Sequence, residues 1–89
     1  MQLKFSIQIW KKGSWFLASC PELDFIAQGK TRAEAQKNLM EVIEIQFEEM
    51  SKMGTLEDYL EECGYEFIEG AVISQPEMIG FEKMDVQVN

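Results

Sequence analysis

Asp and Glu carboxylates are the only side chains in this sequence that are numerous enough to suggest acid–base catalysis or metal binding. The 89 residues include 16 Asp and Glu, 8 Lys and Arg, and no histidine. Without histidine, neither a Ser-His-Asp nor a Cys-His triad can form, and two cysteines far apart in sequence cannot supply a typical zinc shell. The chain also lacks a phosphate-binding glycine loop. The sequence therefore predicts a protein with no catalytic residue, no metal site and no cofactor.

Glu22, Asp24 and Glu34 are the one set of carboxylates that could hold Mg²⁺ for hydrolysis, because they border a turn and a helix start. Each has a simpler structural role. Glu34 follows Thr31 by three residues and completes a capping box, while the other two suit a loop and a strand face. We therefore expect no enzymatic activity, and a metal-dependent nuclease is the less favoured alternative.

The formal net charge of -8 indicates which partners are compatible with the chain. Such a charge repels phosphate, so direct binding of nucleic acid is not expected, whereas a basic protein partner is favoured. Glu41, Glu44 and Glu48 fall on one side of an expected helix. They predict either a solvated helix face or a docking surface for a basic partner.

The first half of the chain carries strand signals. Apolar and polar residues alternate from Leu3 to Ile9, a polar loop follows at 11–14, and strands are expected at 15–20 and 23–28. A four-residue loop would pair Trp10 with Trp15 and Ile9 with Phe16. Trp10, Trp15 and Leu17 would then share the sheet face away from the core. These three residues either stabilise the hairpin or form a contact surface.

Helix signals follow. Thr31 is a suitable N-cap and Gly54 a suitable C-cap, and apolar residues recur at helical spacing between them. Thr55 repeats the N-cap pattern for a short second helix that runs through Leu60 and that Gly64 can terminate. A strand or hairpin is expected over 65–74, and a last strand over 79–88 with a bend between Phe81 and Met84.

These elements predict an α+β fold in a single domain, residues 1–89. It consists of a three-stranded antiparallel meander, a capped helix packed on one face, a short second helix and a further strand. Nothing in the sequence resembles a leader or a membrane span, so a cytoplasmic protein with free thiols at Cys20 and Cys63 is expected. A domain this small has a modest core, and oligomerisation would stabilise it.

Two consecutive motifs carry a family resemblance. An aromatic strand ends in Ala18-Ser19-Cys20-Pro21-Glu22-Leu23, and Gly29-Lys30-Thr31-Arg32-Ala33-Glu34-Ala35 opens a helix that continues through Asn38-Leu39. This order resembles the amino-terminal half of the HicB-like antitoxin family, over roughly residues 3 to 50. The resemblance implies a partial ribonuclease-H-like β-β-β-α-β arrangement in a stand-alone HicB-like domain.

The resemblance also implies a function. Such antitoxins bind a small basic HicA-like toxin, which has a double-stranded-RNA-binding fold and cleaves mRNA, and they mask its active surface. The chain would then be a non-catalytic antitoxin that forms a homo-oligomer, either a dimer or a tetramer. Residues 65–89 lack the basic recognition helix with which full antitoxins bind DNA. The alternative is an orphan homo-oligomeric accessory domain with no toxin partner.

Overall fold

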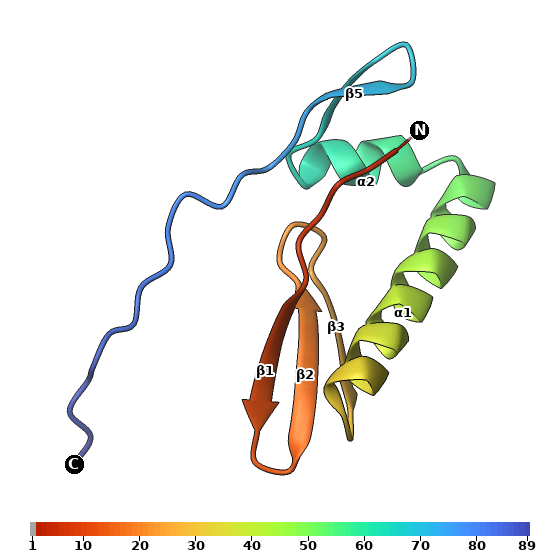
Figure 1. Ribbon diagram of the computed structural model, residues 1–89. Coiled ribbons are helices and arrows are strands. Elements are labelled where there is room, and N and C mark those ends of the chain that lie inside the picture. Colours follow the sequence, from red (N-terminus) through yellow and green to blue (C-terminus); the bar gives the residue numbers. More distant parts are fainter. Residues whose placement is uncertain (1) are drawn as a thin grey trace.

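The computed structural model describes residues 2–89, in which a three-stranded sheet, two helices and a hairpin follow one another (Figure 1). The elements are β1 (Gln8–Lys12), β2 (Trp15–Cys20), β3 (Phe25–Gly29), α1 (Arg32–Met53), α2 (Leu56–Glu62), β4 (Glu66–Ile68) and β5 (Ala71–Ser74). The sheet is antiparallel with the order β1-β2-β3, and β4 pairs only with β5. The predicted α+β fold is confirmed, and the strand or hairpin expected over 65–74 is a hairpin.

The turn between β1 and β2 contains two residues, Gly13 and Ser14, rather than the expected four. Gly13 has a φ of 63°, which suits a two-residue hairpin turn with glycine first. Lys12 therefore pairs with Trp15, and the predicted pairing of Trp10 with Trp15 is wrong by two residues. Because a shift of two residues preserves side-chain direction, every residue keeps its predicted face.

Residues 2–7 are extended but lie outside the ladder, although a strand was expected there. Side chains from elsewhere hold this segment. The Glu22 carboxylate accepts a hydrogen bond from the Ser6 backbone N–H at 2.6 Å, and the Tyr65 hydroxyl donates to the Lys4 carbonyl at 2.7 Å. The predicted alternation survives as a pattern of burial, because the apolar residues of this segment are half-buried and the polar ones exposed.

Helix α1 begins and ends at the predicted caps. The Thr31 hydroxyl accepts a hydrogen bond from the Glu34 backbone N–H at 3.1 Å, and Gly54 ends the helix in the left-handed conformation, with a φ of 72°. Thr55 does not cap α2 as expected. Its hydroxyl donates to the Met50 carbonyl at 3.4 Å and so helps to close α1 instead.

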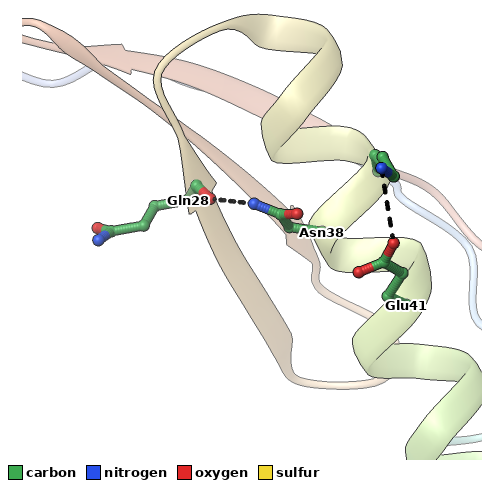
Figure 2. Close-up of polar contacts among 4 residues, drawn as sticks. Gln28, Asn38 and Glu41 are labelled. Atoms are coloured by element: carbon green, nitrogen blue, oxygen red, sulfur yellow. Dashed lines mark hydrogen bonds and ion pairs between the residues drawn. The ribbon is translucent and has the colours of Figure 1, made fainter.

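The core lies between α1 and the inner face of the sheet, and α2 closes one end of it. Its fully buried side chains are Ala18, Cys20, Leu23, Ala35, Leu39, Ile43, Leu60 and Tyr65. A polar contact fixes the helix to the sheet edge, because the Asn38 side-chain amide donates to the Gln28 carbonyl of β3 at 2.9 Å (Figure 2). The helix stripe predicted from sequence is therefore the one that packs on the sheet.

Residues 75–89, called the tail from here on, contain no helix or strand. The predicted strand over 79–88 is therefore wrong. The tail leaves the body after β5 and extends away from it past the β1 side of the sheet (Figure 1). Every residue from Glu77 to Asn89 is exposed.

Candidate functional site

The sheet has one uncovered face, called the outer face here, which carries Trp10, Trp15, Leu17 and Ile26. Strand pairing sets Trp10 opposite Leu17, and Trp15 lies two residues from Leu17 on β2. Trp10 is 43% exposed, Trp15 44% and Ile26 59%. The sequence predicted the first three on one face. It missed Ile26, although the alternation within β3 could have placed this residue there.

The glutamates predicted as a docking surface on α1 are exposed, but two of them already have cationic neighbours. Lys37 Nζ lies 4.0 Å from Glu41 (Figure 2), and Lys52 Nζ lies 3.2 Å from Glu48. Both pairs are one helical turn apart and solvent-exposed, so each contributes little stability but offsets a charge. Glu44 has no ion pair among the residues that the structure describes.

The structure places these two predicted surfaces on opposite sides of the domain. Helix α1 packs against the inner face of the sheet (Figure 1), and Glu41, Glu44 and Glu48 are exposed and take no part in that contact. The outer face lies on the other side of the strands. The two surfaces are therefore separate candidate sites.

Helix α2 forms a more acidic surface that the sequence reasoning missed. Glu57, Asp58, Glu61 and Glu62 are all exposed, and the helix contains no basic residue. None of the four makes an ion pair within residues 2–89. Glu61 and Glu62 also lie at the carboxyl end of the helix, where the helix dipole disfavours negative charge. The sequence signal for this surface was the segment 57–62, in which four of six residues are acidic and none is lysine or arginine.

Glu22, Asp24 and Glu34 do not form the metal site that the nuclease alternative requires. The Glu22 carboxylate is occupied by the Ser6 N–H, and Asp24 lies in the turn before β3 with a φ of 59°. Across residues 2–89, no group of three or more His, Cys, Asp or Glu side chains could hold a metal ion. The structure therefore does not bring these three carboxylates together.

The two cysteines are free, as predicted, and both are partly or fully removed from solvent. Burial raises the pKa of the Cys20 thiol to about 11, and burial also raises the pKa of Cys63. The Cys20 Sγ atom faces the Glu22 carboxylate at 3.8 Å, which disfavours a thiolate further. Both thiols are therefore protonated at neutral pH and poorly suited to act as nucleophiles.

Within the described part of the chain, no helix is both long and apolar enough to cross a membrane. Comparisons of the chain with protein-family models, with curated proteins and with solved structures found no match. The likeness to the HicB-like family therefore depends on the motifs between residues 18 and 39 alone.

Proposed function

We propose that this chain is a non-catalytic protein-binding module that binds and neutralises a small basic protein. The family likeness makes a HicA-like, mRNA-cleaving toxin the favoured partner. The observation that supports this proposal is the acidic surface of α2, whose four carboxylates make no ion pair within residues 2–89. Its charge is available to a partner, unlike the charge of Glu41 and Glu48.

The proposed mechanism is electrostatic masking. A protein that cleaves RNA needs a basic surface to bind phosphates. An acidic protein surface can bind the same basic surface and so compete with RNA for it. Complementary charge accelerates this encounter. The mechanism requires no proton transfer, nucleophile or metal from the antitoxin.

Co-expression with the product of the adjacent reading frame tests the antitoxin role. We expect a basic neighbour to co-purify with this chain and its RNA cleavage to be suppressed in the complex. Association should weaken as salt rises, since the interaction depends on exposed charges. If no basic protein is encoded next to the chain, or if the neighbour does not bind, the antitoxin role is wrong.

A pair of charge-matched variants tests the surface. Glu57→Gln with Glu61→Gln removes two charges from α2, whereas Glu41→Gln with Glu48→Gln removes two from α1. We expect the α2 variant to slow association by about tenfold and the α1 variant to have a smaller effect. Equal effects would show that only net charge matters, and a larger effect of the α1 variant would place the partner on α1.

The outer face favours a second candidate, an orphan homo-oligomeric accessory domain. Trp10 and Trp15 remain about two-fifths exposed, and tryptophan is among the commonest interface anchors. In this case Trp15→Ala should shift the sedimentation of the pure protein toward monomer. If Trp15→Ala and the native chain have the same sedimentation coefficient over a wide concentration range, Trp15 is not part of an interface between copies.

A further inference from the structure

We propose that residues 79–88 of each chain add as a strand to the β1 edge of a second copy, so that two copies exchange their tails. The inference concerns self-association and does not depend on the toxin. It identifies the second copy of this chain as the occupant of the free sheet edge and of the apolar surface beside it.

The tail carries apolar side chains that its own chain leaves in solvent. The exposed fractions are 97% for Ile79, 62% for Phe81, 83% for Met84, 84% for Val86 and 85% for Val88. The tail backbone makes no hydrogen bond to other described residues. The Cα radius of gyration is 15.5 Å, against about 12 Å for a compact domain of this length. An extended apolar segment of this kind is what strand addition buries.

The receiving surface is the outer edge of β1. The sheet order leaves β1 paired on one side only, by β2, so its other edge is open to strand addition. Phe81 already lies beside Trp10, with ring centroids 6.5 Å apart. With Gln8, Ile9 and Lys83 they line an open groove of about 390 Å³, so that the tail residues Phe81 and Lys83 form one wall of the groove and β1 forms the other. The tail thus touches its own β1 without filling the adjoining space.

The alternation of the tail matches the faces of β1. If Phe81 lies on the outer face beside Trp10, residues an odd number of positions away from it point to the inner face. Met84, Val86 and Val88 then share that inner face. In an antiparallel pairing with β1 they would extend the core beside Ile7, Phe5 and Leu3, which are half-buried at its β1 margin, and Glu82 would lie beside Ile9. Strand addition would therefore bury tail residues that are now more than four-fifths exposed.

The charges near the β1 edge favour the tail of a second copy, rather than a basic protein, as the occupant of that edge. The β1 side carries Lys4, Lys11 and Lys12, three of the eight basic residues of the chain. The tail carries Glu77, Glu82 and Asp85 with a single Lys83. The acidic tail complements the basic edge, whereas a basic toxin would be repelled by it.

The route of the tail favours exchange over closure onto its own chain. Pro76 lies beside Gly64, just after α2, where a Cβ on Gly64 would be 3.2 Å from the Pro76 Cγ. From there the tail runs past the β1 side of the sheet (Figure 1) and makes no backbone hydrogen bond to its own β1. Exchange covers the open β1 edges of both copies at once, which gives a closed two-fold dimer.

Sedimentation of a matched pair of variants tests the exchange. We expect the native chain to sediment at twice its 10.3 kDa mass, and Val86→Asp to raise the dimer dissociation constant at least tenfold. Ile45→Asp is the control, because Ile45 is exposed to 59% on α1, outside the proposed interface. It should remain dimeric. A monomeric native chain, or equal dissociation of both variants, would overturn the proposal.

Cross-linking separates exchange from closure within one chain. Gln8→Cys and Lys83→Cys, each in a Cys63→Ser background, are made in separate chains, one of which carries an affinity tag. After mixing, denaturing, refolding and mild oxidation, exchange predicts a disulfide between tagged and untagged chains. If the mixed chains do not cross-link, while a chain with both substitutions closes its own disulfide, the tail binds its own β1 and the proposal is wrong.

Discussion

Gly29 and Ala35 approach so closely that a Cβ atom on Gly29 would lie 2.5 Å from the Ala35 backbone nitrogen. Gly29 is the last residue of β3, and Ala35 lies in the first turn of α1. The contact sets how closely the helix lies on the sheet. It also gives a structural reason for glycine at the start of the Gly-x-Thr-x-x-Glu-Ala motif.

Gly29→Ala should therefore destabilise the fold. The methyl group would meet backbone atoms that cannot move without displacing the start of α1, and such overpacking costs about 1–3 kcal/mol. The free energy of unfolding in urea measures the effect. Gly80→Ala is the matched control, since a Cβ at Gly80 would meet nothing within 4 Å and should change stability by less than about 0.5 kcal/mol. Equal stabilities of the two variants would contradict the close contact.

Asn38→Ala should loosen the contact between α1 and β3. The substitution removes the 2.9 Å hydrogen bond to the Gln28 carbonyl (Figure 2), and a bond of this kind contributes about 0.5–1.5 kcal/mol. Gln36→Ala serves as the control, because Gln36 is exposed on the same helix and makes no side-chain hydrogen bond in residues 2–89. Thermal unfolding should show a lower Tm for the first variant only. A similar Tm for both would mean that water replaces the amide.

Tyr65→Phe should release the amino-terminal segment. The phenol is buried, and its hydroxyl donates to the Lys4 carbonyl at 2.7 Å. Loss of the donor leaves that carbonyl without this partner, at a cost of about 1 kcal/mol or more. Amide hydrogen exchange should accelerate in residues 2–7 and remain slow in β2. Unchanged protection of residues 2–7 would show that Glu22 alone holds the segment.

The free energy of unfolding should decrease at alkaline pH because two buried acidic groups, Cys20 and Tyr65, lose protons there. Burial raises the pKa of Cys20 from 9.0 to about 11 and that of Tyr65 from 10.0 to about 12. The folded state holds these protons more tightly than the unfolded chain, so stability falls as pH rises. The contribution is complete below the unfolded pKa values and is lost as pH rises from 9.0 toward 12.

Urea midpoints measured across this alkaline range should decline steadily. Tyr65→Phe should show a shallower decline, because one of the titrating groups is gone. A midpoint that does not change over the same range would contradict the buried environment of both groups.

Local signals in the sequence determined where the helices lie. Thr31 and Gly54 act on backbone groups within one turn of themselves, and the apolar stripe from Ala35 to Ile43 needs only a flat apolar surface to cover. The alternation of the strands likewise determined which residues face the core. This is why an error of two residues in the hairpin register left Trp10 and Leu17 on the predicted face.

Tertiary structure decided what depends on residues far apart in the chain. Alternation in residues 79–88 predicted a strand, but a strand needs backbone hydrogen bonds to a partner edge, and the tail makes none to the open edge of β1 that it passes. The separation of the outer face from the acidic helices also appeared only once α1 was packed on the inner face. Composition determined the acidic character of this protein, and helical spacing alone pairs Glu41 with Lys37 and Glu48 with Lys52. Packing decided which side of the domain each surface occupies, because that depends on contacts between residues far apart in the chain.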